Sequence, residues 1–232
     1  MISHILLDVE GTITDIEFVT NVLFPYARSR MADFIRDHET DAEVVDALVS
    51  VREFMNNDCA TLDAIVNQCI QWIDEDRKEP ALKTLQGLIW SYGYESGVLK
   101  GHVYEDAKQQ IDSWHEAGLS LGIYSSGSVQ AQKLLLRHST WGDLTDRFSH
   151  HFDTKVGHKR EMTSYQAIAQ ALGIRPTEIL FLSDVSQELD AASFAGMLTC
   201  GVSRYGEGAC GSHPTVTQLS EVNLQDFSLG HV

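Results

Sequence analysis

The sequence is short of basic residues. Lysine and arginine together number 17, aspartate and glutamate number 33, and the formal net charge is −16. Proteins that bind nucleic acids or anionic membranes gain affinity from Lys and Arg beside phosphate groups, so this composition argues against both kinds of partner. No run of about 18 apolar residues is present. Acidic Asp8 and Glu10 lie in the N-terminal stretch where a signal peptide would be apolar, so we expect a cytoplasmic protein.

Cysteine and proline are also scarce. The four cysteines are widely spaced and form no CxxC motif, so we expect reduced thiols rather than disulfides or a zinc site. They are Cys59, Cys69, Cys200 and Cys210. The four prolines and a hydrophobic fraction of 43% are ordinary for a folded globule and exclude a disordered or collagen-like chain. A length of 232 residues allows one large domain, or a compact domain with a smaller companion.

Short apolar runs that stop at a polar residue predict the strands of a sheet. Continuous rather than alternating hydrophobicity is typical of strands buried on both faces of a parallel sheet. The runs are 5–7 before Asp8, 121–124 before Ser125, 179–182 before Ser183 and 198–202 before Ser203. Helical patterns alternate with them over residues 103–117, 128–137, 162–172 and 187–195. The alternation predicts a doubly wound α/β sheet.

Residues 18–97 break this alternation. They carry almost no strand signal, and their apolar residues recur at helical spacing. Because the stretch follows the first strand directly, we predict a mainly helical domain inserted into an α/β core of residues 1–17 and 98–232. The glycines suited to hinges near its return to the core are Gly93, Gly97 and Gly101.

The polar residues that end the predicted strands are the candidate functional residues, because ligands of open α/β sheets bind outside the carboxyl ends of the strands. Asp8 and Glu10, followed by Gly11, place two carboxylates on one tight turn. There, one can act as a nucleophile and the other as an acid or base beside a bound phosphate. Two solvated carboxylates are the alternative, since charged strand ends are common at protein surfaces.

Serines and a lysine supply candidate phosphate-binding groups. Ser125 and Ser126 precede a predicted helix, whose N-terminus favours a phosphate oxygen. A simple helix cap at Ser126 or Ser128 is the more common use of such residues. Lys159 alone would read as a solvated charge. Two unit charges 4 Å apart repel by about 4 kcal/mol at an effective dielectric of 20, so Asp8 needs nearby positive charge to approach a phosphate dianion.

Acids at the third strand end complete the candidate site. Asp184 follows this strand and Glu188 lies one helical turn later. Together with Asp8 they would form an oxygen-rich pocket that suits Mg²⁺, which prefers few carboxylates plus waters and phosphate oxygens. Glu188 has two interpretations: it orients a metal-bound water, or it is an acid placed near the start of a helix dipole.

These elements, in this order, resemble the motifs of the haloacid dehalogenase superfamily, whose phosphatases use a DxD motif, a Ser or Thr, a Lys and a terminal acidic motif. Here the second acid is Glu10 rather than Asp. With that departure, several segments resemble one branch, the enolase-phosphatases of methionine salvage. They are residues 18–19, 23–27, 101–104, 123–128, 131–135, 152–154 and 179–184. The similarity runs from residue 5 to about residue 204.

The resemblance implies a Rossmann-like core with a helical cap, one Mg²⁺ per chain and a small phosphorylated substrate, and we expect a monomer. In the reaction of this branch, 2,3-diketo-5-methylthiopentyl 1-phosphate is enolised and then dephosphorylated to the acireductone. Asp8 would attack phosphorus, while Glu10 would protonate the leaving oxygen and then activate water. The Mg²⁺ ligands would be Asp8, Asp184 and the backbone carbonyl of Glu10. The phosphate would be held by Ser125, Ser126 and Lys159.

Other functions stay open at this point. A small-molecule or sugar phosphatase of the same superfamily would differ in releasing phosphate without enolising a diketo substrate. A hydrolytic dehalogenase would work without Mg²⁺ and usually lacks the second acid, so Glu10 counts against it. A phosphoaccepting receiver domain needs adjacent acids at its first strand and no large helical insertion, so it fits poorly.

Histidines and aromatic residues outside these motifs are expected to be structural. His150, His151 and His158 lack the spacing of a zinc site and read as loop histidines with satisfied hydrogen bonds. The helical region is rich in aromatics, which are core residues more often than substrate contacts. A thioether substrate would want an apolar pocket, so Phe18, Phe24 and Trp90 are candidates to line one.

Overall fold

The computed structural model describes residues 1–206 and 210–227 and divides into two compact units. One unit comprises Met1–Ile16 and Gly101–Val232, and the other comprises Glu17–Lys100. The strands lie in the first unit, and the second is helical. That the helical unit serves as a cap for the functional site stays a prediction.

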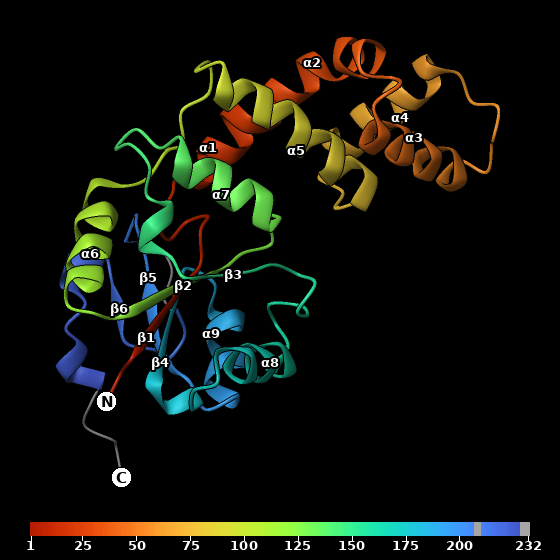
Figure 1. Cartoon of the computed structure of the whole chain (residues 1–232). Coiled ribbons are helices and arrows are strands. Elements are labelled where there is room, and N and C mark those ends of the chain that lie inside the picture. Colours follow the sequence, from red (N-terminus) through yellow and green to blue (C-terminus); the bar gives the residue numbers. More distant parts are fainter. Residues whose placement is uncertain (207–209, 228–232) are drawn as a thin grey trace. The chain divides into compact units, whose positions relative to one another are not determined.

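The larger unit is built on a six-stranded sheet of order β3-β2-β1-β4-β5-β6, in which every neighbouring pair is parallel (Figure 1). The strands are β1 (His4–Leu7), β2 (Ser120–Tyr124), β3 (His150–Phe152), β4 (Ile179–Ser183), β5 (Leu198–Val202) and β6 (Thr215–Val216). β1, β2, β4 and β5 form at the four predicted apolar runs, and β1 and β4 are buried throughout. The predicted doubly wound α/β fold is confirmed.

Two strands, β3 and β6, are not predicted from the sequence pattern. β3 has three half-buried residues, two of them histidines, and β6 has two residues in a turn-rich segment. Neither carries the apolar run that marks a strand buried on both faces. The loop prediction for His150 and His151 is therefore wrong, because both lie in β3. His151 is nevertheless satisfied, since its Nδ1 lies 3.1 Å from the Oε1 atom of Gln132.

Four helices of the larger unit form at the predicted segments. They are α6 (Glu105–Glu116), α7 (Val129–Arg137), α8 (Met162–Leu172) and α9 (Ser186–Phe194). α8 and α9 pack on one face of the sheet, where Tyr165 and Leu189 share a core with Leu6 and Phe181. Figure 1 shows α6 on the opposite side. The sheet is thereby covered on both faces, which explains the continuous apolar runs of its central strands.

The helical unit contains α2 (Phe24–Asp37), α3 (Ala42–Phe54), α4 (Leu62–Asp74) and α5 (Pro80–Glu95), preceded by α1 (Ile16–Phe18) and a π-helical turn over Val19–Leu23. Trp90 donates its indole N–H to the carbonyl of Leu23 at 2.9 Å and stacks on Phe24 with ring centroids 6.4 Å apart. Both aromatic residues therefore contribute to packing within this unit. Among the described residues, no helix has the length and apolar character needed to cross a membrane.

The glycines near the return to the core serve packing and helix termination. Gly93 lies inside α5, where a Cβ atom would collide with Tyr26 and Leu99. Gly97 follows α5 with a φ of +74°, and Gly101 approaches the backbone of Leu135 too closely for a side chain. The hinge interpretation is therefore wrong for Gly93, because that residue is fixed within a packed helix.

His4, at the start of β1, couples stability to pH. The residue is 1% exposed, and its Nδ1 lies 3.0 Å from the hydroxyl of Ser120. Burial, followed by the nearby His150, lowers the pKa of His4 from 6.5 to about 4. The unfolded chain therefore takes up the proton first as pH falls, and this stability is lost progressively from about pH 6.5 toward pH 4. We expect a loss of about 2 kcal/mol in unfolding free energy between pH 7 and pH 5.

Urea denaturation of the wild type and of His4→Gln at pH 7 and pH 5 measures this effect. The glutamine side chain retains hydrogen-bonding groups near Ser120 but does not titrate. We expect the variant to lose about 2 kcal/mol less than the wild type between the two pH values. An equal pH dependence in both proteins would contradict the role given to His4.

Candidate active site

The predicted site residues meet at the carboxyl ends of three neighbouring strands. Leu7 of β1 is paired with Ile123 of β2 on one side and with Leu182 of β4 on the other. Asp8 follows β1, and its N–H donates to the carbonyl of Leu182 at 2.9 Å. Ser125 follows β2 and Asp184 follows β4. The strand order reverses at β1, so these residues lie where open α/β sheets bind ligands.

A buried lysine bridges two carboxylates at the centre of the site. The Nζ atom of Lys159 lies 2.5 Å from Oδ1 of Asp8 and 2.7 Å from Oε2 of Glu188. Lys159 is 6% exposed, Asp8 is 3% exposed and Glu188 is 8% exposed, so water screens these charges little. The hydroxyl of Ser183 joins them, at 3.2 Å from Oδ2 of Asp8 and 3.0 Å from Oε2 of Glu188.

The protonation states follow from this geometry. Burial lowers the pKa of Lys159, but the carboxylates of Asp8 and Glu188 outweigh it and raise that pKa above its ordinary value. Burial, and then the charge of Asp8, raises the pKa of Glu188 to about 7. Lys159 is therefore a permanent cation beside Asp8, as the approach of a phosphate to a carboxylate requires.

The loop before α8 fixes the position of Lys159. The hydroxyl of Tyr165 donates to the carbonyl of Lys159 at 2.7 Å, and the hydroxyl of Ser164 donates to the carbonyl of His158 at 2.8 Å. Gly157 has a φ of +145°, and a Cβ atom there would collide with Ser164. The first turn of α8 thus holds the loop on both sides of the lysine.

Glu10 lies on the Asp8–Thr14 turn, whose backbone is closed on itself. The amides of Thr12, Ile13 and Thr14 all donate to the carbonyl of Val9. The Oε2 atom of Glu10 accepts a hydrogen bond of 3.0 Å from the hydroxyl of Ser125. Burial, and then the charge of Asp8, raises the pKa of Glu10. A raised pKa suits a carboxyl group that gives and takes a proton near neutral pH.

Gly11 brings the Asp8–Thr14 turn against Asp184. Its φ is +73°, and a Cβ atom at this position would collide with the carboxylate of Asp184. Burial, and then the charge of Asp8, raises the pKa of Asp184 to about 6. This residue therefore faces negative charge that a cation would relieve.

The serines after β2 divide in their roles. Ser125 is buried, and its hydroxyl accepts from the amide of Gly127 at 3.0 Å while donating to Glu10. Ser128 caps α7 by accepting from the amide of Ala131 at 3.2 Å, which is the structural use considered for it. Ser126 is exposed, and its phosphate-binding role stays a prediction.

Three residues near the site were given no role by the sequence reasoning. Ser183 bridges Asp8 and Glu188, although its place at a strand end was a usable signal. Gln132 donates to the carbonyls of Gly127 and Phe152 at 3.1 and 2.8 Å, and Asp153 accepts from the amide of Val129 at 3.3 Å. Both residues lie in segments that resemble the enolase-phosphatase branch, but the sequence does not show that Gln132 bonds to Phe152 and Asp153 to Val129, which are 20 and 24 residues away.

The haloacid dehalogenase-like hydrolase family matches residues 2–196 of this chain. The chain belongs to this family. Its similarity to individual members extends over nearly the full length. It is 49% identical to the Enolase-phosphatase E1 of Pseudomonas fluorescens, covering 97% of this chain and 99% of that protein. It is 47% identical to the Enolase-phosphatase E1 of Yersinia enterocolitica, covering 98% and 100% of the two chains.

Solved structures share the fold of this chain. The UTR4 protein of Saccharomyces cerevisiae is 33% identical with a TM-score of 0.81, covering 96% of this chain and 100% of that one. The L-2-haloacid dehalogenase of Xanthobacter autotrophicus is 18% identical with a TM-score of 0.58 over the full length of both chains. At that identity the second likeness concerns the fold alone.

The donor set of this haloacid dehalogenase-like hydrolase fits a Mg²⁺ ion. In the part of the chain that the structure describes, no group of three His, Cys, Asp or Glu side chains is arranged to hold a metal by itself. Mg²⁺ does not need such a cage, since it usually binds one or two carboxylates together with waters and substrate phosphate. The carboxylates of Asp8 and Asp184 are of this kind, and burial, followed by the charge of Asp8, raises the pKa of Asp184.

Gly11→Ala is expected to damage the hydrolase more than Gly173→Ala. Gly173, at the end of α8, has a similar φ of +69°, but no atom lies within 4 Å of a Cβ placed there. In both variants the left-handed backbone should lower the free energy of unfolding by about 1 kcal/mol. Gly11→Ala also displaces Asp184, which should lower it by about 1–3 kcal/mol more. Urea denaturation and phosphatase assays measure both effects. Equal stability and activity in the two variants would contradict the close packing of Gly11 on Asp184.

Proposed function

We propose that the chain is a bifunctional enolase-phosphatase of methionine salvage. It enolises 2,3-diketo-5-methylthiopentyl 1-phosphate and then removes the phosphate, giving the acireductone 1,2-dihydroxy-3-keto-5-methylthiopentene. The observation that carries the proposal is the pair Asp8 and Glu10 on one turn beside the buried Lys159, in a chain 49% identical to an Enolase-phosphatase E1. The cytoplasmic location and the monomeric state stay predictions.

Asp8 acts as the nucleophile in the dephosphorylation. An oxygen of its carboxylate forms a bond to phosphorus, and the bond between phosphorus and the enolate oxygen breaks. Glu10 donates its proton to that leaving oxygen, and its raised pKa supports this use. The resulting carboxylate of Glu10 then takes a proton from water, which attacks phosphorus and releases Asp8. Two displacements replace one very slow hydrolysis.

The phosphate is held by Ser125, Ser126 and Lys159. The buried ammonium of Lys159, 2.5 Å from Asp8, supports this use because it offsets the repulsion between the carboxylate and the incoming phosphate. One Mg²⁺ would be held by Asp8, Asp184 and the backbone carbonyl of Glu10, and it would supply a Lewis acid for the phosphoryl transfer and the enolisation. Glu10, one methylene longer than Asp, is our candidate for the base that takes the proton from the substrate carbon.

A substrate panel tests the proposal. Phosphate release should be fastest from the diketo phosphate, and at least ~100-fold slower in kcat/KM from sugar phosphates, which lack the acidic carbon and the thioether. Removing Mg²⁺ with EDTA should abolish release, whereas unfolding by urea should be unchanged because the core packs without the metal. Comparable kcat/KM for a sugar phosphate would favour a plain phosphatase of the same family.

A further inference from the structure

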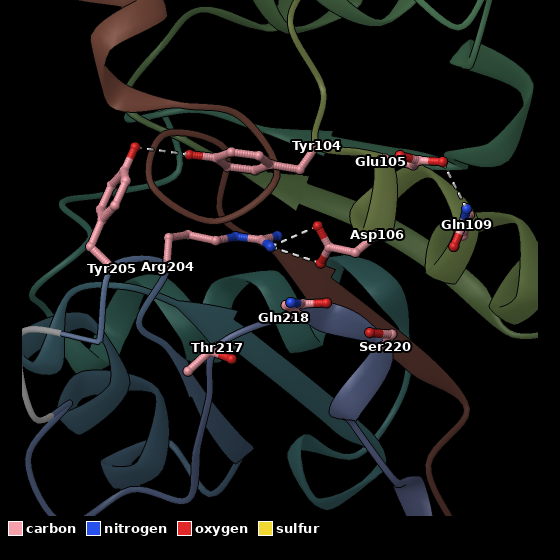
Figure 2. Close-up of a pocket in the computed structure, with 9 residues that line it drawn as sticks. All are labelled: Tyr104, Glu105, Asp106, Gln109, Arg204, Tyr205, Thr217, Gln218 and Ser220. Atoms are coloured by element: carbon pink, nitrogen blue, oxygen red, sulfur yellow. Dashed lines mark hydrogen bonds and ion pairs between the residues drawn. The ribbon is translucent and has the colours of Figure 1, made fainter.

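Arg204, two residues beyond β5, has its guanidinium buried against the Asp8–Thr14 turn. Its Nε and Nη2 atoms both donate to the carbonyl of Thr12, at 3.0 and 2.5 Å. Its Nη1 atom lies 2.8 and 2.7 Å from the two carboxylate oxygens of Asp106, in the first turn of α6. Tyr104 lies over the guanidinium, 4.3 Å from ring centroid to carbon. The side chain is 6% exposed, and Figure 2 shows the ion pair beneath Tyr104 and Tyr205.

The carbonyl of Thr12 is a sensitive point of this turn. Thr12 follows Gly11, which packs on Asp184, and comes two residues after Glu10. The amide of Thr12 is used inside the turn, and its buried hydroxyl has no hydrogen-bond partner among the described residues. The two bonds from Arg204 therefore tie this residue to the rest of the α/β unit. Tyr104 adds a second tie, because its amide donates to the carbonyl of Ile13 at 3.0 Å.

The role of Arg204 is positional rather than electrostatic. Asp106 neutralises its charge through two hydrogen bonds, so the pair adds little field at the phosphate site. Asp106 is itself fixed, since one of its oxygens accepts from the amide of Leu219 at 2.7 Å. The planar guanidinium thus links two rigid partners, an arrangement that a lysine cannot reproduce.

We propose that Arg204 is a positioning residue for the reaction at Asp8, acting through the Thr12 carbonyl to set where Glu10 and Gly11 lie. The reaction named here rests on the proposed function. Lys159 and Ser125, which hold the phosphate, come from other segments of the unit. Loss of Arg204 therefore lowers kcat, because Glu10 and the Asp8–Thr14 turn are no longer correctly placed, while KM changes little.

A pocket beside Arg204 makes the proposal testable by chemical rescue. It has a volume of about 430 Å³ and opens over the Arg204–Asp106 pair (Figure 2). Its walls include Tyr104, Gln109, Thr217 and Gln218, so a small cation can reach the position that Arg204 vacates. Guanidinium has the same planar set of N–H donors as the missing arginine side chain. Tetramethylammonium carries the same positive charge but has no hydrogen-bond donors.

The experiment compares Arg204→Ala, Arg204→Lys and Arg147→Ala. Arg147 pairs with Asp112 on the same helix α6 at 2.8 Å and serves as the matched control. We expect both Arg204 variants to lose about 10- to 100-fold in kcat with KM changed less than ~3-fold, and Arg147→Ala to keep its activity. Millimolar guanidinium chloride should restore at least ~5-fold in kcat to Arg204→Ala, and tetramethylammonium chloride should restore none. If Arg204→Ala does not fold, the kcat and KM of Arg204→Lys decide.

Amide hydrogen exchange gives a readout independent of activity. The amides of Thr12, Ile13 and Thr14 should exchange at least ~10-fold faster in Arg204→Ala and slow again with guanidinium. Unchanged kcat in the Arg204 variants, a loss that guanidinium does not reverse, or unchanged exchange in the turn would overturn the proposal. If the wild type releases no phosphate from the diketo substrate, the proposed function fails, and the exchange comparison still decides the role of Arg204.

Discussion

Asp8→Asn is expected to lower the rate of phosphate release by about 10⁴-fold or more, because the amide cannot form the aspartyl-phosphate. The fold should survive. Lys159 keeps its ion pair with Glu188 at 2.7 Å. Removal of the charge on Asp8 also removes its electrostatic repulsion of the carboxylates of Glu10, Asp184 and Glu188. Steady-state phosphate release with the diketo phosphate measures the first effect, and thermal unfolding measures the second.

Asp112→Asn is the matched control for this substitution. Asp112 pairs with Lys108 and Arg147, both at 2.8 Å, so the variant removes the same charge from a carboxylate that also holds cations. Its activity should remain within ~2-fold of the wild type, since its ion-pair partners Lys108 and Arg147 are not candidate site residues. Phosphate release by Asp8→Asn at more than a tenth of the wild-type rate would remove Asp8 from the role of nucleophile.

Lys159→Met is expected to be the most destabilising of the site variants. It leaves the carboxylates of Asp8 and Glu188 buried without their shared cation, and breaking a buried ion pair by removing one partner costs about 3–5 kcal/mol. The free energy of unfolding from urea denaturation at pH 7.5 measures this cost. Activity should also fall at least ~100-fold, because the phosphate would meet Asp8 without compensating charge.

Two comparisons separate the effect of burying the ion pair from the effect of losing a lysine charge. Lys78→Met removes a lysine that pairs with Asp76 at 2.5 Å, but both side chains are more than half exposed, so its cost should stay below ~1 kcal/mol. Adding Glu188→Gln to Lys159→Met should recover about 1 kcal/mol or more, because one uncompensated charge is removed. Similar costs for Lys159→Met and Lys78→Met would show that the buried network contributes no more than a surface pair.

The sequence is sufficient to predict the sheet where strands are buried on both faces. The apolar runs that become β1, β2, β4 and β5 are continuous because helices cover both faces. β3 and β6 leave no such signal, since they are short and lie toward the edges. Gly93 shows a second limit. The sequence alone does not distinguish a glycine that is required by packing against Tyr26 from a glycine that serves as a hinge.

The residues of the candidate site also fall into those that the sequence predicts and those that it does not. Asp8, Ser125 and Asp184 are predictable because parallel strands align their carboxyl ends at one edge of the sheet. Lys159 lies in the loop between β3 and α8 rather than directly at a strand end. Its identification depended on the charge that a phosphate requires and on the resemblance of the motifs. Arg204 was not predictable, since its use depends on contacts with Thr12 and Asp106 at sequence separations of 192 and 98 residues.

The most direct test of the proposed function is the ultraviolet spectrum of the enzyme mixed with the diketo phosphate and Mg²⁺ under single-turnover conditions, recorded together with phosphate release. Asp8→Asn serves as the control. We predict that the absorbance of an enol intermediate rises before phosphate appears, and that Asp8→Asn releases no phosphate on the same timescale. Phosphate release with no preceding enol signal, or at an undiminished rate in Asp8→Asn, would contradict the proposed two-step reaction.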